Sequence, residues 1–259
     1  MYELELIASD ADLVNSDVDL RSADEVRLFY GSLLGQSSVS ALRFVECGEA
    51  FGSFGLFDEA LESFGRAVAK DGGCLRAYLA RGELYFELAV CAQSDEERKV
   101  LGRKAVEDFR KALLLSLGLS DVIWSLGVAL ILIEEPESAK SLAKNALMKG
   151  SVAGASVRCD FLYLLGLAQV FARDREAAEQ AFEALMEVDG EVSTAWFGRI
   201  VCSLVLSRGT RVDDFLRELE PLDSALFKAA RSLEQSGCAS FVNVVRALSD
   251  VGVTVKKRK

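Results

Sequence analysis

The side chains that could carry chemistry are six cysteines and many carboxylates, because the sequence contains no histidine. The absence of histidine excludes His-based metal sites, His general bases and Cys–His or Ser–His nucleophilic pairs. The cysteines form no CxxC pair, and most lie among apolar neighbours, where cysteine packs as a small hydrophobic residue. Cys91, beside a polar insertion, is the one candidate for a redox-active thiol. The six are Cys47, Cys74, Cys91, Cys159, Cys202 and Cys238.

The carboxylates cluster near the starts of expected helices rather than in a catalytic arrangement. Examples are the pairs at 58–59 and 213–214 and the triplet at 95–97. Carboxylates at these positions satisfy unpaired backbone amides and interact favourably with the helix dipole. The sequence also lacks a P-loop, a GxGxxG motif and a GxSxG motif. We therefore expect no enzymatic activity, no cofactor and no metal.

The composition indicates an all-α protein whose charge does not suit nucleic acid. The 259 residues include only two prolines, and the alternation of β-branched residues typical of strands is scarce. The net charge of −10 disfavours nucleic-acid binding, because phosphates require clustered Lys and Arg. The one basic cluster, at 256–259, is expected to be a solubilising tail.

No segment has the pattern of an export signal or of a membrane span. The first residues lack both a basic region and a long apolar region. The longest apolar run, at 128–133, is too short to cross a bilayer. Together with the unpaired cysteines, these features predict a protein of the reducing cytoplasm.

A repeated spacing runs through most of the chain. Gly48 is followed by apolar residues at offsets of 12, 16 and 19, and the same offsets recur after Gly127 and Gly166. The pattern also holds after Gly82 if 11 residues are inserted, and a degenerate copy begins at Ile200. Gly48 and Gly82 are 34 residues apart, a period typical of stacked helical hairpins. The residues at these offsets are Ala60, Phe64 and Ala67; Ala139, Ala143 and Ala146; Ala178, Phe182 and Leu185; Ala105, Phe109 and Ala112; and Val212, Leu216 and Leu219.

These positions resemble the tetratricopeptide-repeat (TPR) family. The pattern has a small residue late in the first helix and an aromatic residue three positions later, and the second helix has Ala and a large apolar residue. These residue types allow the two helices to pack closely. The resemblance covers about residues 41–226 and implies a right-handed α-solenoid of antiparallel helix pairs, in about five copies with the fifth degenerate. The best two copies contain Phe44, Gly48, Phe51, Ala60, Phe64 and Ala67, and Tyr78, Gly82, Tyr85, Ala105, Phe109 and Ala112.

The expected boundaries follow the repeat. An acidic leader with one helix is expected at 1–40, capping helices at 227–250 and the basic tail at 251–259. The solenoid at 41–226 divides into copies at 41–74, 75–119, 120–153, 159–192 and 193–226. A capping pattern from Ser94 to Glu97 begins a new helix within the insertion. We therefore predict two long helices, at 75–92 and 95–117, that project from the solenoid.

The resemblance implies that the first helix of each copy lines a concave groove for a protein or peptide. Chaperone-docking members of the family hold a C-terminal carboxylate in a clamp of Lys, Asn and Arg. The corresponding positions here include Glu49 and Asp121, which would repel a carboxylate, so we expect no binding to chaperone tails. The expected partner-binding residues are Glu49, Leu79, Glu83, Phe86, Glu87, Trp124, Val128, Ile131, Tyr163, Leu167, Phe171 and Phe197.

This groove becomes more apolar towards its C-terminal end, and two explanations remain open. Either a partner covers residues such as Trp124, Phe171 and Phe197, or the chain's own C-terminal helices do, because so large an apolar patch is rarely left exposed. The first explanation predicts a scaffold or adaptor that binds an apolar or amphipathic segment, with basic flanks attracted by the glutamates. The alternatives are a structural subunit of a larger assembly and a groove occluded by residues 1–20.

Overall fold

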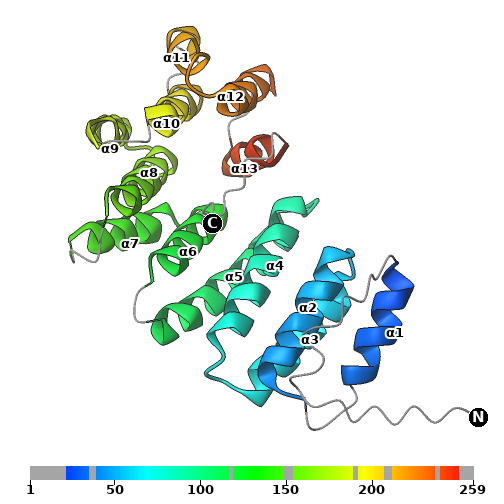
Figure 1. The fold of residues 1–259 in the computed structure, drawn as a ribbon. Coiled ribbons are helices and arrows are strands. Elements are labelled where there is room, and N and C mark those ends of the chain that lie inside the picture. Colours follow the sequence, from blue (N-terminus) through cyan, green and yellow to red (C-terminus); the bar gives the residue numbers. More distant parts are fainter. Residues whose placement is uncertain are drawn as a thin grey trace, which may run out of the picture.

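The fold is a succession of α-helices that forms a curved array (Figure 1). The structure is a computed structural model that describes residues 22–34, 39–116, 119–148, 154–188, 192–206, 212–236 and 240–250. Residues 1–21 of the acidic leader and the basic tail at 251–259 lie outside these ranges. The helices are α1 (Ala23–Leu34), α2 (Ala41–Ser53), α3 (Phe57–Lys70), α4 (Leu75–Cys91), α5 (Asp95–Leu115), α6 (Ser120–Leu132), α7 (Pro136–Met148), α8 (Ala155–Phe171), α9 (Arg175–Glu187), α10 (Val192–Leu206), α11 (Val212–Leu219), α12 (Ser224–Ser236) and α13 (Phe241–Asp250).

Helices α2 to α11 pack as successive pairs. In each pair the first helix (α2, α4, α6, α8 or α10) contacts the second helix that follows it in the chain. The first helices also contact one another along the array. The array therefore curves with its first helices on the inside, as Figure 1 shows. This arrangement confirms the predicted all-α solenoid. Among the residues that the structure describes, no helix is both long and apolar enough to cross a membrane.

Phenylalanine rings packed against glycines hold helix pairs together. A Cβ atom added to Gly48 would lie 2.5 Å from Cε1 of Phe64, and one added to Gly166 would lie 2.4 Å from Cε1 of Phe182. These distances are too short for any real Cβ, so the helices approach as closely as they do only because the position is glycine. Phe182 meets a second glycine, since a Cβ on Gly198 of α10 would lie 2.3 Å from the same atom. The ring therefore lies between glycines of two first helices.

The spacing pattern predicts one further glycine contact correctly and misplaces another. A Cβ on Gly82 would lie 2.9 Å from Cε1 of Phe109, as the pattern predicts. For Gly127 the pattern points to Ala143, but the nearest atom to an added Cβ is Cδ2 of Leu164, at 2.4 Å. An alanine is too short to fill this position, so a leucine of the next first helix, α8, packs there instead.

The insertion lengthens α4 and α5, as predicted. Ser94 caps α5 by accepting a hydrogen bond from the backbone N–H of Glu97, at 3.2 Å. The expectation that the two helices project from the solenoid is wrong at the end of α4, where Val90 is 8% and Ala92 6% exposed. The last helix of the chain packs over this end.

A buried ion pair joins the same two helices. The Arg81 guanidinium donates from Nη2 to Oδ1 of Asp108 at 2.7 Å and from Nε to Oδ2 at 2.8 Å. The Asp108 side chain is only 5% exposed, and its hydrogen bond raises the pKa of Arg81 above its ordinary value. Both carboxylate oxygens depend on this one arginine for a strong, charge-assisted contact.

Adding a methyl group at Gly166 should destabilise the protein. Phe182 cannot move away from Gly166 without meeting Gly198, so we expect Gly166→Ala to lower the free energy of unfolding by about 1–3 kcal/mol. The control is Gly65→Ala in α3, where the nearest atom to an added Cβ is 4.0 Å away. That change should raise stability by up to about 1 kcal/mol, through helix propensity alone. Urea unfolding followed by circular dichroism measures both, and effects of the same sign would contradict the packing argument.

Removing Arg81 should cost more than removing an exposed arginine. Arg81→Met leaves the buried Asp108 carboxylate without its cation, and we expect a loss of about 3–5 kcal/mol. The matched control is Arg76→Met, because Arg76 pairs with Glu49 at an exposed position, where the loss should stay below about 1 kcal/mol. The same unfolding assay compares the two variants. Equal losses would show that the Arg81–Asp108 pair has no special structural role.

Candidate functional site

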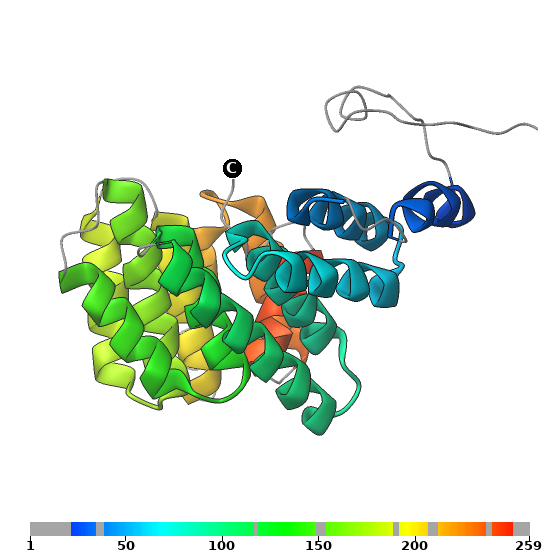
Figure 2. The same ribbon diagram turned by 90° about the horizontal axis from the view of Figure 1, so that it is seen from below.

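The inner face of the solenoid is partly filled by the last helix. α13 packs beside α12 and contacts α4 and α6. Figure 1 shows α13 inside the curve of the array, and Figure 2 shows it, in orange-red, between the α4–α5 pair and the later helices. The chain's own C-terminal helix therefore covers the apolar end of the groove. The alternative occlusion by residues 1–20 concerns residues outside the described ranges.

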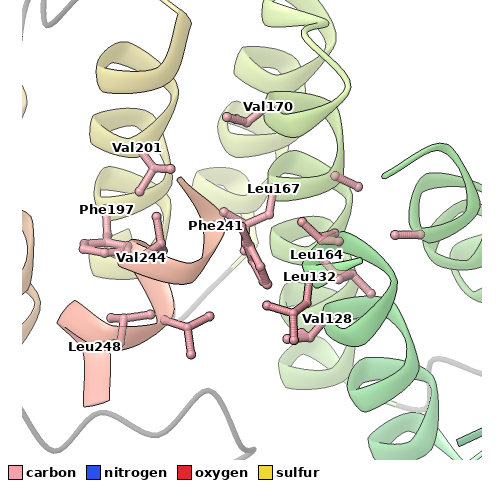
Figure 3. Close-up of a cluster of buried hydrophobic side chains, with 14 of the residues drawn as sticks. Val128, Leu132, Leu164, Leu167, Val170, Phe197, Val201, Phe241, Val244 and Leu248 are labelled. Carbon is pink, nitrogen blue, oxygen red and sulfur yellow. The ribbon is translucent and has the colours of Figure 1, made fainter. Parts of the chain in front are cut away.

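Apolar side chains of α13 pack into a slot between three first helices (Figure 3). Phe241, Val244 and Leu248 belong to one buried cluster with residues of α6, α8 and α10. The ring of Phe241 meets the ring of Phe171 edge-on, with centroids 5.3 Å apart. We call this region the α13 slot. It is lined by Val128, Leu132, Leu167, Val170, Phe171, Phe197 and Val201.

An arginine of α13 joins it to the end of α4. The Arg246 guanidinium donates from Nη2 and Nε to the carbonyl oxygen of Val90, at 2.7 and 3.1 Å, and from Nη2 to that of Ala92 at 3.4 Å. Carbonyls in the last turn of a helix have no partner within the helix and carry partial negative charge. A cation is favoured there, and α4 reaches this point because the insertion lengthens it. Sequence reasoning missed this contact, which joins residues 156 positions apart.

The structure divides the expected partner-binding residues into two sets. Val128, Ile131, Leu167 and Phe197 are buried within the protein. The other eight keep contact with solvent: Glu49 and Glu87 are exposed, and the half-buried residues are Leu79, Glu83, Phe86, Trp124, Tyr163 and Phe171. Of these half-buried residues, Phe171 belongs to the α13 slot. The rest lie on α4, in the first half of α6 and at the middle of α8.

Two aromatic residues of α6 and α8 stack on each other. The rings of Trp124 and Tyr163 have centroids 6.2 Å apart and planes inclined by 14°. Tyr163 also contacts Phe182, at 6.2 Å, and burial raises the pKa of its hydroxyl above the ordinary value. The stacked pair is a rigid, partly exposed aromatic surface.

An acidic residue at the start of the inner face is already paired. Glu49 accepts two hydrogen bonds from Arg76, at 2.6 and 3.1 Å. Its charge is therefore largely compensated within the protein. The other two glutamates expected to attract basic flanks, Glu83 and Glu87, lie one helical turn apart on α4.

Of the cysteines that the structure describes, Cys47, Cys74, Cys159 and Cys202 are buried, as core residues are. Burial raises the pKa of both the Cys47 and the Cys202 thiols to about 11, so they stay protonated at neutral pH. Cys91 is exposed and lines an open hollow of about 580 Å³ with Arg27. The Arg27 guanidinium, however, is bonded to Glu59 at 2.8 Å. Within the described ranges, no group of three or more Cys, Asp or Glu is placed to hold a metal ion.

Similar solved structures share this fold. The first is a tetratricopeptide repeat protein from Parabacteroides merdae, with a TM-score of 0.64 at 12% identity, covering 89% of this chain and 84% of that one. The second is YrrB, described as a TPR protein with an unusual peptide-binding site, with a TM-score of 0.51 at 18% identity over 78% of this chain and 97% of that one. The third is MamA, with a TM-score of 0.51 at 17% identity over 76% of this chain and 94% of that one.

The sequence comparison agrees with the structural one. No curated protein matches the chain in sequence. A family model described as a tetratricopeptide repeat matches residues 48–88 and 163–211. These segments contain the glycine–phenylalanine contacts of the first and fourth helix pairs. The chain is therefore a helical repeat protein, and two of its segments match the tetratricopeptide-repeat model.

Proposed function

We propose that this chain is a non-enzymatic scaffold that binds an apolar or amphipathic segment of another protein. The observation that carries this proposal is the partial exposure of aromatic and aliphatic side chains on three first helices, with Trp124 of α6 stacked on Tyr163 of α8. We call this surface the open strip. It consists of Leu79, Glu83, Phe86, Glu87, Trp124 and Tyr163.

The open strip has the chemistry of a peptide-binding surface. Trp and Tyr are enriched among the residues that contribute most to binding, because a large rigid ring is desolvated at little entropic cost. Full burial of an exposed Phe side chain contributes about 1.5–3 kcal/mol, so completing the burial of half-buried Phe86 contributes roughly half of that. Glu83 and Glu87 attract basic residues that flank an apolar segment and so favour the correct register. The peptide-binding site described for YrrB supports a similar use of this fold.

Replacing Trp124 should weaken peptide binding without unfolding the protein. Peptides selected on the immobilised chain from a random library should carry apolar residues at helical spacing with Lys or Arg at one end. We expect Trp124→Ala to lower the affinity for such a peptide by about ten-fold or more, measured by fluorescence anisotropy.

The matched control for Trp124→Ala is Trp196→Ala. Trp196 packs on Phe215 of α11, with ring centroids 5.7 Å apart, and does not belong to the open strip. This variant should bind the selected peptide as the wild type does. The open strip would be the wrong surface if both variants bind equally well, provided that both keep the wild-type circular dichroism spectrum.

A second candidate function is a structural subunit of a larger assembly. The observation that favours it is a set of exposed apolar residues at one edge of the solenoid, where second helices end and first helices begin. Leu114 is 74% and Met148 75% exposed, and Leu115 and Leu119 are exposed nearby in the chain. Permanent interfaces are larger and more apolar than transient ones.

The mass of the purified chain separates the two functions. For a scaffold with transient partners, we expect light scattering after size exclusion to give a monomer. The double variant Leu114→Gln, Met148→Gln should then have the same mass. Self-association of the wild type that this double variant abolishes would favour the subunit instead.

A further inference from the structure

The last helix has the properties of a bound ligand helix. α13 contains ten residues, and isolated helices shorter than about 12–15 residues are marginal in water. Its helical form therefore depends on what it packs against. The apolar residues Phe241, Val244, Val245 and Leu248 recur at spacings i, i+3, i+4 and i+7, which is the pattern of helices that bind in apolar grooves.

The α13 slot is built by helices that do not need α13 for their own packing. Its walls come from α6, α8 and α10, and each of these contacts the second helix of its own pair. Phe182 also holds α8 and α10 together through Gly166 and Gly198. Without α13 the slot would keep its walls and expose a continuous apolar surface, which favours a new apolar occupant.

The hydrogen bonds from Arg246 to the end of α4 require a basic residue, but water can replace them. Arg246 is exposed, although its guanidinium reaches the carbonyls of Val90 and Ala92. When α13 leaves, water can solvate both the guanidinium and the carbonyls at the end of α4. The contact therefore selects a basic residue at one position of the docked helix and does not lock the helix in place.

We propose that α13 is a displaceable internal ligand and that the α13 slot binds a short amphipathic helix of a partner protein. The partner helix carries an aromatic residue at its first position and aliphatic residues at the fourth, fifth and eighth. Its sixth residue is Arg or Lys, which donates to the carbonyls of Val90 and Ala92. This site is separate from the open strip, and the proposal does not depend on the function proposed above.

The first test measures competition between α13 and the same helix added as a peptide. The probe is a fluorescein-labelled peptide with the sequence of residues 240–250, titrated into the full chain. In the variant Val244→Asp, a carboxylate replaces a side chain that is 1% exposed, and α13 should leave the slot. We expect this variant to bind the peptide at least ten-fold more tightly than the wild type does.

Two controls make this result specific. Val100→Asp introduces the same change at an exposed position of α5 (43% exposed) and should bind the peptide as the wild type does. A peptide that itself carries Val244→Asp should not bind. Equal affinity of the wild type and Val244→Asp for the probe would overturn the proposal. Loss of the helical circular dichroism signal in Val244→Asp would also overturn it, since α13 would then be part of the core.

Amide hydrogen exchange of the unmodified full chain is the second test. Local opening exposes amides without global unfolding, so a displaceable α13 should exchange at least ten-fold faster than α8 and α10. Equal protection of the three helices would overturn the proposal, because α13 would open only when the whole protein unfolds. The proposal would also be overturned if the wild type dimerises and the amides of α13 are protected from exchange only in the dimer. The α13 slot would then be occupied by α13 of a second copy of this chain.

Discussion

The close approach of helices at glycine is the constraint on which the rest of the structure depends. Where Gly48 or Gly166 meets a phenylalanine of the second helix, the two backbones come nearer than any side chain would allow. Phe182 extends this effect from one pair to the next, because it lies against glycines of both α8 and α10. The spacing of the first helices is set in this way, and that spacing gives the inner face its width. A single helix, α13, fits into the space that results.

The repeat and its packing could be predicted because their signals are local. Gly48 and Phe64 are 16 residues apart, and a helix–turn–helix unit brings such residues together whatever the rest of the chain does. The contact between Gly127 and Leu164 was missed for the opposite reason, since it joins two pairs. Arg246 was missed because an arginine on a short helix is unremarkable in sequence. Its partner is a backbone carbonyl, which has no sequence signature.

The sequence predicted on which side of the solenoid the candidate site lies. It did not predict which residues on that side are exposed. The family resemblance placed Val128 and Leu167 on the inner side of the solenoid together with Leu79 and Trp124. It could not show which of these residues the chain itself would cover. That division depends on where α13 docks, and so on contacts between the two ends of the array. The pairing of Glu49 was not predictable either, because Arg76 lies 27 residues away in the next first helix.

The insertion in the second repeat also links helix length to the position of the last helix. Each residue added to or removed from α4 would rotate its final carbonyls by about 100° and shift them by about 1.5 Å along the helix axis. Arg246 can follow such a change only if α13 slides or turns in its slot, and that would move Phe241 away from Phe171. A change by whole helical turns would keep these carbonyls pointing in the same direction, but each turn would still shift them by about 5.4 Å. In related chains with a different insertion, the basic residue of the last helix should change its position by a matching step or be absent.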